Sequence, residues 1–477
     1  MSGKLIGRKK EQEILLDALN SSEAEMVSLV GRRRVGKTFL VTSLYQEKIV
    51  FELTGIQNAS RAIQLRNFRD VLTERMESEI NLELPIDWLD AFNQLKKYLK
   101  PLLEKDKKVI FLDELPWMAT HKSGFLEAFG YFWNSWASRQ NLVVVICGSA
   151  ASWMIQKVVR DKGSLHNRIT KRINLQPFNL KDTEQYLLHR RISFERYQLL
   201  HLYMVLGGVP HYLKEIKRGY SAAQNIDELC FSNNGLLKEE FENLYTALFK
   251  NAHKHIEIVR ILAGRQYGMS RDMLIKHSKM SSGKGFTKLL EELTLSGFIS
   301  AFYPFGNKKT DLIYRLTDEF SLFYFQFMDG RKKDSDNVWK HLSQTQSYKT
   351  WSGYAFENIC LKHIYQIKLA LKIAGVYSTI SSFYQKGGES EKGSQIDLVL
   401  DRNDHVINLF EIKFYQENVR INKAYAHKLR EKAQVFRAKT KTRKQIFWTL
   451  MTTFGLDQNH HSLDLIDSAL NMDILFE

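Results

Sequence analysis

The stretch GRRRVGKT, from Gly31 to Thr38, decides the fold that the sequence predicts. It follows the apolar run MVSLV and precedes FLVTSLYQ, so a glycine-containing loop joins a buried strand to a helix. Glycines let the backbone curl until successive N–H groups surround a phosphate at a helix N-terminus, where the helix dipole favours negative charge. The pattern therefore predicts a phosphate-binding loop formed by Gly31, Arg32, Arg33, Arg34, Val35, Gly36, Lys37 and Thr38.

Four side chains in and beyond this Walker A loop predict binding and hydrolysis of ATP with Mg²⁺. Lys37 would contact the β- and γ-phosphates, and Thr38 would supply a hydroxyl to the metal ion. Asp113, at the end of the strand-like run VIFLD, would hold Mg²⁺ through water as a Walker B aspartate, and Glu114 would orient the attacking water. The alternative is a glycine turn beside an unrelated acidic surface pair.

Two further features near this site leave alternatives open. Ser149 ends the strand NLVVVICGS, where a residue that senses the γ-phosphate would lie, although a solvent-exposed serine turn fits the sequence equally well. The side chains of Arg32, Arg33 and Arg34 add positive charge near the phosphates. Such side chains normally point away from the loop, so we expect them to contact solvent or a partner.

The first 250 residues predict an α/β architecture. Apolar runs that begin at Met26, Lys48, Lys108, Asn141 and Arg172 alternate with helical stretches, which is typical of parallel strands buried on both faces. This pattern predicts a P-loop core over residues 1–178. Helical periodicity with one GGVP turn follows and predicts a helical lid over 179–250 that completes the ATPase module.

The next segment, residues 251–330, has the order of a winged helix-turn-helix: three short helices, then two strand-like runs around a polar GNKK turn. Its basic residues are suitable phosphate contacts, which favours DNA binding, although acidic Glu291 and Glu292 on the same helix also fit a rigid interdomain connector. A polar linker is predicted over 331–349. The basic residues are Arg271, Lys276, Lys279, Lys284, Lys288, Lys308 and Lys309.

Residues 350–477 predict a second α/β domain, with a helix ahead of the strands QIDLVLD, VINLFEIKF and KQIFWTL. Asp397 lies on one strand, and Glu411 and Lys413, two residues apart on the next, point to one face. Two carboxylates on adjacent strands can hold one or two Mg²⁺ or Mn²⁺ ions on a phosphodiester, while a lysine positions the attacking water. A chance D…ExK pattern is the alternative.

Composition agrees with a nucleic-acid partner. The 477 residues carry a formal net charge of +16, and ten Lys or Arg against one acidic residue lie between Arg420 and Lys444. We expect DNA rather than RNA, with a solvated helix face as the alternative. Three dispersed cysteines, no signal-like segment and no apolar run long enough for a membrane span predict a cytoplasmic protein without membrane contact.

The segments LIGRKKEQEILLDAL, GRRRVGKT, FLDELPWM, VICGSAASWM and MVLGGVPHYL together resemble archaeal-type ATPases related to AAA+ and STAND proteins. The resemblance covers roughly the first 330 residues. It implies a sheet with the P-loop strand central and the Walker B strand two strands away. It also implies an arginine after the sensor strand, for which Arg168 matches best, and a nucleotide-sensing role for Pro210 or His211 in the GGVP turn.

The last 125 residues or so resemble the PD-(D/E)XK nucleases, which share the restriction-endonuclease fold. Asp397, Glu411 and Lys413 match the motif, while Ile396 stands where the motif's proline would be. Glu357, in the helical segment GYAFEN, matches the additional acidic residue that many of these nucleases carry. The resemblance implies a metal site formed by Glu357, Asp397 and Glu411.

Together these features predict a cytoplasmic ATPase whose nucleotide cycle controls a winged helix and a metal-dependent nuclease domain, in DNA processing or in defence against mobile DNA. The first alternative is an ATP-driven regulatory switch whose nuclease-like domain only binds nucleic acid. The second is a STAND-like signalling ATPase that responds to a protein trigger and assembles into a homo-oligomer.

Overall fold

We describe a computed structural model of the chain, covering residues 5–76, 82–149, 151–159, 163–306, 312–331, 338–385 and 393–477. The chain forms two compact units, which we describe separately. The first contains Met1–Pro177 and Ala247–Lys250, and the second contains Phe178–Thr246 and Asn251–Glu477.

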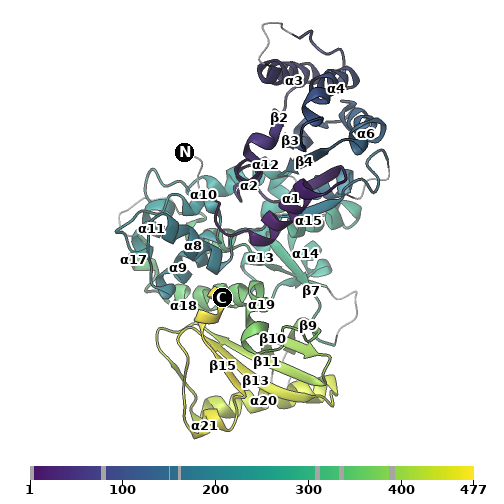
Figure 1. Ribbon diagram of the computed structural model, residues 1–477. Helices are drawn as coiled ribbons and strands as arrows, with labels where there is room; N and C mark the ends of the chain where they lie inside the picture. Colours follow the sequence, from purple (N-terminus) through teal and green to yellow (C-terminus); the bar gives the residue numbers. More distant parts are fainter. Residues whose placement is uncertain are drawn as a thin grey trace. The chain divides into compact units, whose positions relative to one another are not determined.

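The first unit is built around a parallel five-stranded sheet in the order β2-β3-β4-β1-β5, of which Figure 1 labels β2, β3 and β4. Its strands coincide with the five predicted runs. Every residue of β1 and β4 is buried, as expected for strands covered on both faces. The strands are β1 (Glu25–Val30), β2 (Ile49–Thr54), β3 (Lys108–Asp113), β4 (Leu142–Gly148) and β5 (Lys171–Asn174).

This strand order positions the predicted ATPase motifs. Strand β1 lies between β4 and β5, and β3 is two strands from β1, as the resemblance implied. The P-loop strand is flanked on both sides, although the middle of the sheet is β4. The phosphate-binding loop and the ends of β3 and β4 therefore meet at the carboxyl edge, where ligands bind in open parallel sheets.

Helices cover the sheet of the first unit. Helices α1 and α2 share a core with one sheet face through Leu15, Leu40, Val27 and Val145. Helices α3, α4 and α6 form an aromatic cluster in which Phe68 contacts Phe51 of β2. The helices are α1 (Lys9–Asn20), α2 (Lys37–Tyr45), α3 (Arg61–Met76), α4 (Trp88–Leu103), α5 (Leu115–Met118), α6 (Phe125–Ser135) and α7 (Ala151–Met154), with short turns Gln46–Lys48, Ala137–Arg139 and Ile155–Val159.

The second unit begins with helices that include the predicted lid. Helix α9 packs against α16 and α18, and α11 packs against α17, so the region 179–246 shares its core with the C-terminal half of the chain. The helices are α8 (Leu180–His189), α9 (Arg196–Leu206), α10 (Pro210–Leu213), α11 (Ala222–Cys230), α12 (Glu240–Leu248), α16 (Glu319–Phe323), α17 (Val338–Leu342), α18 (Gln346–Lys362) and α19 (Ile364–Ala370).

Residues 252–316 form three helices and a small antiparallel sheet of order β6-β8-β7. Lys276, Lys279, Lys284 and Lys288 are exposed there, whereas Arg271 stacks on the ring of Phe286 at 5.6 Å. The predicted contacts Lys308 and Lys309 lie outside the described residues. The elements are α13 (Ala252–Ala263), β6 (Met269–Ser270), α14 (Arg271–Ser278), α15 (Lys284–Leu295), β7 (Ile299–Phe302) and β8 (Ile313–Leu316).

The prediction of a polar linker over 331–349 is wrong for its described part. Helix α17 lies within it, and α18 already begins at Gln346. Trp339 of α17 is only 2% exposed and packs edge-on against the rings of Phe323 and Trp351. A large buried aromatic side chain gives this segment a core position that its overall polarity conceals.

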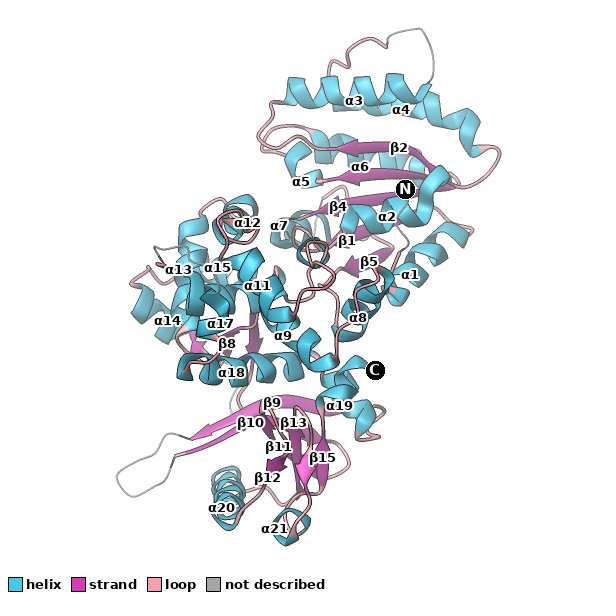
Figure 2. Ribbon diagram, turned by 90° about the vertical axis from the view of Figure 1, so that its left-hand side faces the viewer, coloured by secondary structure: helices cyan, strands magenta, loops and turns pink. Residues whose placement is uncertain are grey.

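The C-terminal part of the second unit is a five-stranded mixed sheet of order β15-β13-β11-β10-β9. Strands β9, β10 and β11 are antiparallel, and β11, β13 and β15 are parallel. Figure 2 shows α18 and α19 on one side of this sheet and α20 and α21 on the other. The elements are β9 (Ser378–Gln385), β10 (Ser394–Arg402), β11 (Val406–Lys413), β12 (Val419–Arg420), α20 (Lys423–Thr440), β13 (Gln445–Thr452), β14 (Leu456–Asp457), α21 (His460–Leu463) and β15 (Ser468–Leu470), with turns Tyr324–Met328 and Met472–Phe476.

Two global expectations concern cysteines and membranes. Cys147, Cys230 and Cys360 are buried free thiols. Burial raises the pKa of the Cys147 thiol, so this side chain stays protonated beside Asp113. No helix in the described part of the chain combines the length and apolarity that a bilayer span requires.

Candidate functional site

The loop between β1 and α2 has the backbone that a phosphate-binding turn needs. Gly36 has φ of 89° and Arg34 has φ of 70°, so both lie in the left-handed region. This conformation is common for glycine and costly for arginine, and such strain gathers at functional sites. A Cβ on Gly31 would lie 2.6 Å from the carbonyl oxygen of Leu175, so close packing requires glycine there.

Lys37 is held inside this loop. Its Nζ donates to the carbonyl oxygens of Gly31 at 2.9 Å and Arg32 at 3.0 Å, and to Ser149 Oγ at 2.9 Å. Lys37 is only 6% exposed, so these oxygens replace the water that its ammonium group loses. Since one of the three acceptors is a side chain on another strand, the lysine connects the loop with the end of β4.

Ser149 connects Lys37 with Glu114. Its hydroxyl donates to Glu114 Oε1, and its backbone N–H donates to Glu114 Oε2 at 3.1 Å. Ser149 is 5% exposed, which excludes the alternative of a solvent-exposed serine turn. Glu114 itself has φ of 47°, a strained conformation that directs its carboxylate away from the β3 strand and toward β4.

Thr38 and Asp113 form the second half of the site. Thr38 Oγ1 donates to Asp113 Oδ2 at 2.6 Å, and Asp113 Oδ1 accepts from the Glu114 N–H at 2.9 Å. The hydroxyl and the carboxylate are thus within reach of a single cation, and oxygen ligands of this kind suit Mg²⁺. The donor set fits the magnesium–nucleotide group that the loop predicts.

The three arginines of the loop differ in exposure. Arg33 and Arg34 are half-buried, whereas Arg32 is 5% exposed, so the expectation of a solvated side chain is wrong for Arg32. Val35 is buried in the core beneath α2.

Arg8 is a positioning residue that the sequence analysis missed. It is 7% exposed, and its guanidinium donates to the carbonyl oxygens of Val35, at 3.2 Å, and Gln176. One arginine thus fixes the P-loop to the chain that leaves β5. The only sequence signal was its position in the quoted segment LIGRKKEQ.

Arg168, the arginine that the resemblance implies after the sensor strand, is exposed in the turn before β5. Its backbone N–H donates to the carbonyl oxygen of Leu165 at 3.1 Å. Among the described residues, no hydrogen bond or ion pair joins its side chain to the P-loop.

The GGVP turn is fixed by packing within the second unit. A Cβ on Gly208 would lie 2.1 Å from the carbonyl oxygen of Phe178, and one on Gly207 would lie 2.6 Å from Glu319 Oε2. Both glycines also have positive φ. Pro210 begins α10 directly after the turn, and His211 follows it. Both positions therefore require glycine, because Phe178 and Glu319 lie too close for a side chain.

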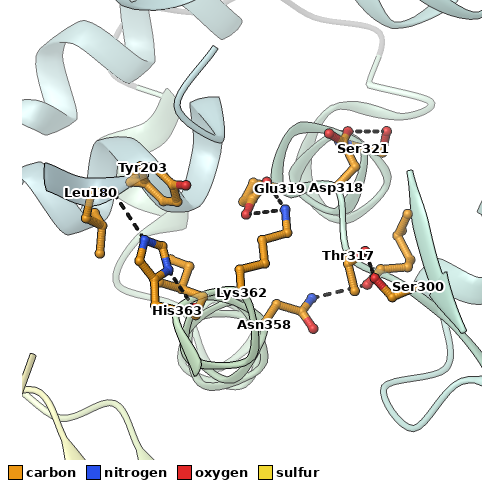
Figure 3. Close-up of polar contacts among 12 residues, drawn as sticks. Leu180, Tyr203, Ser300, Thr317, Asp318, Glu319, Ser321, Asn358, Lys362 and His363 are labelled. Carbon is orange, nitrogen blue, oxygen red and sulfur yellow. Dashed lines mark hydrogen bonds and ion pairs between the residues drawn. The ribbon is translucent and has the colours of Figure 1, made fainter. Parts of the chain in front are cut away.

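Figure 3 shows the polar contacts beside this turn. Lys362 donates to both carboxylate oxygens of buried Glu319, at 2.7 and 2.8 Å. His363 Nε2 accepts from the backbone N–H of Leu180 at 3.1 Å, and Asn358 donates to the carbonyl oxygen of Leu316 at 3.1 Å. Helix α18 and its C-cap therefore connect α8, α16 and the small antiparallel sheet.

A second polar cluster lies on the C-terminal sheet. Strands β10 and β11 pair Leu398 with Phe410, and extending this register by one residue puts Asp397 opposite Glu411. Asp397 Oδ2 accepts from the Ile412 N–H at 3.2 Å. Burial and the neighbouring Glu411 raise the pKa of Asp397. The structure thus brings the two predicted carboxylates together.

Glu411 is buried and neutralised by cations. Its Oε1 lies 2.8 Å from Lys413 Nζ and its Oε2 lies 2.6 Å from Lys432 Nζ, while the Tyr425 hydroxyl donates to Oε1 at 3.2 Å. Burial opposes ionisation, but the charges of Lys413 and Lys432 outweigh it and lower the pKa of Glu411. Reciprocally, Glu411 raises the pKa of Lys413 despite its burial.

Glu357 approaches from α18 on the other side of the sheet. Its Oε2 accepts from Arg315 Nη2 of β8 at 3.0 Å, and Arg315 also stacks on the Tyr354 ring at 4.4 Å. Burial and the charge of Asp397 raise the pKa of Glu357, against the opposing effect of Arg315. Asp397 therefore interacts electrostatically with a carboxylate on each side of the sheet.

The metal site expected from Glu357, Asp397 and Glu411 is not formed as predicted. Within the described ranges, no group of three or more His, Cys, Asp or Glu side chains is placed to hold a metal ion. The physical reason lies in the ion pairs, since Arg315 holds Glu357 and two lysines hold Glu411. Asp397 and Glu411 remain neighbours.

Four residues around this cluster were missed: Arg315, Gln395, Tyr425 and Lys432. Gln395 donates to Asp397 Oδ1 at 3.1 Å. Lys432 belongs to the basic stretch noted in the sequence, but nothing there singles it out from nine other cations. Its contact with Glu411 depends on how α20 packs on the sheet.

Two family models match separate parts of the chain. Residues 5–216 match a family model described as an ATPase domain predominantly from Archaea. Residues 324–427 match a model described as Archaea bacterial proteins of unknown function. The chain is therefore similar to an archaeal-type ATPase domain in its first part and to a family of unknown function further along. A curated relative, an uncharacterized protein of Methanocaldococcus jannaschii, is 23% identical over 420 residues, or 86% of this chain and 87% of the relative.

Solved structures give more distant likenesses. A Walker-type ATPase of Pyrococcus abyssi has a TM-score of 0.49 at 17% identity, covering 68% of this chain and 96% of its own. The ORC2 protein of Aeropyrum pernix, solved as ADPNP and ADP complexes, has a TM-score of 0.43 at 16% identity, covering 72% and 96%.

Proposed function

We propose that the first unit binds ATP with Mg²⁺ and hydrolyses it. The observation that carries this proposal is the continuous contact from Lys37 through Ser149 to Glu114, beside the Thr38–Asp113 pair. Lys37 and the loop N–H groups would hold the phosphates, and Thr38 and Asp113 would hold the metal ion. Bound Mg²⁺ supplies neutralisation of phosphate charge.

Glu114 and Ser149 would then have linked roles. Glu114 would orient the attacking water, and Ser149 would contact the γ-phosphate while holding the carboxylate of Glu114. Because Ser149 also accepts from Lys37, displacement of any one of these three groups alters the partners of the other two. Arg168 would act only when a second copy of the chain presents it to the site.

ATP turnover in four variants tests this part. Lys37→Ala should abolish nucleotide binding, and Glu114→Gln should retain binding and trap ATP by slowing hydrolysis. Lys97→Ala, on an exposed position of α4 outside the loop, is the control and should leave turnover unchanged. Arg168→Ala should reduce turnover only at concentrations where the chain self-associates. Normal turnover in both Lys37→Ala and Glu114→Gln would refute the assignment.

We infer further that residues 252–316 are a winged helix and that the C-terminal sheet belongs to the PD-(D/E)XK nuclease fold, with the nucleotide cycle controlling nucleic-acid binding and cleavage. The order of helices and strands supports both assignments. Asp397, Glu411 and Lys413 would form the reactive set. Binding of Mg²⁺ or Mn²⁺ by the two carboxylates requires Lys432 to leave Glu411, which makes Lys432 available to a phosphate.

Cleavage of plasmid and linear DNA, and of RNA, with Mg²⁺ or Mn²⁺ tests the nuclease proposal in the presence and absence of ATP. Activity should disappear in Glu411→Ala and Lys413→Ala and persist in Glu417→Ala, an exposed carboxylate six residues further along the chain. Loss in all three variants would indicate a structural defect instead of a reactive site.

A second candidate is an ATP-driven regulatory switch in which the C-terminal sheet only binds nucleic acid. The complete occupation of Glu411 by Lys413, Lys432 and Tyr425 favours it, because a metal ion would have to replace these partners. Absence of cleavage on every substrate, with nucleic-acid binding retained, is its expected result. A STAND-like signalling role predicts nucleotide-dependent oligomers, which mass photometry would detect.

A further inference from the structure

A groove of about 940 Å³ lies beside the carboxylate cluster of the C-terminal sheet. Its floor and walls come from one face of α20, from the neighbouring ends of β9 and β10, and from Tyr267 in the turn before β6. The residues that carry the argument are Tyr267, Tyr384, Gln395, His427, Lys428 and Lys432. All of them belong to the second unit.

Helix α20 presents a cationic face to this groove. Ala424, His427, Lys428, Glu431 and Lys432 line it, at the three- and four-residue spacing of one helix side. The opposite face packs on the sheet through the buried side chains of α20. Glu431, the one carboxylate on this face, lies 3.6 Å from His427 Nδ1, which offsets its charge when the imidazole is protonated. The helix therefore offers exposed Lys428 to an anionic ligand, while Lys432 is paired with Glu411.

Two tyrosines stand at the mouth of the groove. Tyr267 is 46% exposed and Tyr384 is 58% exposed, although both have large apolar rings. Their ring centroids are 5.7 Å apart and the ring planes differ by 21°, so the two rings stack on one another. Stacking orders the pair while leaving ring surface open to solvent, and the base of a nucleotide can stack on such a surface.

Contacts at the inner end connect the groove with the carboxylates. Gln395 lines the groove together with Tyr267 and donates to Asp397 Oδ1 at 3.1 Å, and Lys432 lies 2.6 Å from Glu411 Oε2. The groove therefore adjoins the carboxylate cluster through Gln395 and Lys432. The groove is continuous with the cluster to which we assigned the reactive set.

We propose that this groove binds single-stranded nucleic acid, with unpaired bases stacked on Tyr267 and Tyr384 and phosphate held by Lys428. The inference deepens the proposed nuclease function and rests on its placement of the reactive set. Exposed aromatic rings beside the cationic face of α20 suit unpaired nucleotides, because the faces of unpaired bases are free to stack. In a duplex the bases stack on each other, so the rings would contribute nothing and only Lys428 would bind.

Fluorescence anisotropy of the full chain tests this proposal in EDTA, where metal-dependent cleavage is impossible. The probes are labelled single strands of about 16 nucleotides, the upper end of known single-strand sites, and the corresponding duplexes, each as DNA and as RNA. The wild-type chain should bind single strands more tightly than duplexes. Tyr384→Leu, which keeps apolar bulk, should weaken single-strand binding by about 5- to 100-fold and leave duplex binding unchanged.

Lys428→Gln should weaken binding of both forms and lower the salt dependence of the affinity by about one phosphate contact. Tyr365→Leu, on an exposed tyrosine of α19 outside the groove, is the matched control and should change nothing. The proposal is overturned if the wild-type chain binds duplex as tightly as single strands, or if neither Tyr384→Leu nor Tyr267→Leu weakens single-strand binding. If Glu411→Ala loses cleavage but keeps these affinities, the reactive set is needed for cleavage and the groove for binding.

Discussion

Acid should destabilise the second unit through His363. This residue is 2% exposed at the C-cap of α18, and its Nε2 accepts from the Leu180 N–H. Its Nδ1 lies 2.8 Å from the carbonyl oxygen of Ile359, which assigns the proton to Nδ1. A second proton on Nε2 would oppose the Leu180 N–H. Burial accordingly lowers the pKa of His363 from 6.5 to about 4.

The size of the effect follows from this pKa. A decrease from 6.5 to about 4 corresponds to roughly 3 kcal/mol, since one pKa unit is worth about 1.36 kcal/mol. Above pH 6.5 the imidazole is neutral in both the folded and the unfolded chain. As the pH falls, the unfolded chain binds the proton first. The free energy of unfolding therefore decreases between about pH 6.5 and pH 4.

Urea unfolding of the full chain, measured at several pH values across this window, tests the argument. In His363→Gln the amide oxygen can accept from Leu180 without titrating, so the variant should lose about 3 kcal/mol less than the wild type on acidification. His253→Gln, on an exposed position of α13, is the control. His201, a half-buried imidazole whose pKa desolvation lowers to about 4, affects both chains equally. An identical pH dependence in wild type and His363→Gln would refute the reasoning.

Three further predictions concern the core, the GGVP turn and the ATPase site. Trp339→Ala should reduce the free energy of unfolding by about 3–5 kcal/mol, and an unchanged urea midpoint would contradict its core position. Gly208→Ala should destabilise the chain by more than about 1 kcal/mol, because the added Cβ would clash with Phe178. Gly219 also has a positive φ, but a Cβ there would meet open space, so Gly219→Ala reports backbone strain alone. A calorimetric comparison of the two variants separates the clash from the strain. Ser149→Ala should retain ATP binding but lower turnover at least about tenfold, because Glu114 loses the hydroxyl donation to Oε1 and keeps only the backbone N–H donation to Oε2. Unchanged turnover would make Ser149 a packing residue.

The sheet of the first unit could be predicted because its strands are covered on both faces and read as continuous apolar runs. Strand β9 gave no such signal. Its sequence STISSFYQ is polar and only two of its residues are buried, since the strand lies at the sheet edge. Trp339 was missed for a related reason, because one aromatic residue in a polar stretch has no periodicity.

The candidate sites divide in the same way. Lys37, Thr38, Asp113, Asp397 and Glu411 follow from local spacing, which fixes loop geometry and strand faces. Partner residues that distant elements contribute cannot be predicted from local spacing. Lys432 and Arg315 reach their carboxylates only through tertiary packing, and they are the residues that oppose the expected three-carboxylate metal site.

Helix α18 restricts how this chain can vary in length. Glu357 and Lys362 lie on the same helix, five residues apart, so helix geometry fixes their separation at roughly 7.5 Å of rise. Deleting one residue between them would turn one contact set by about 100° relative to the other, breaking either the Arg315 pair or the Glu319 pair. Homologous chains that keep both pairs must therefore keep this interval, whereas turns such as the one at Gly219 are free to lengthen.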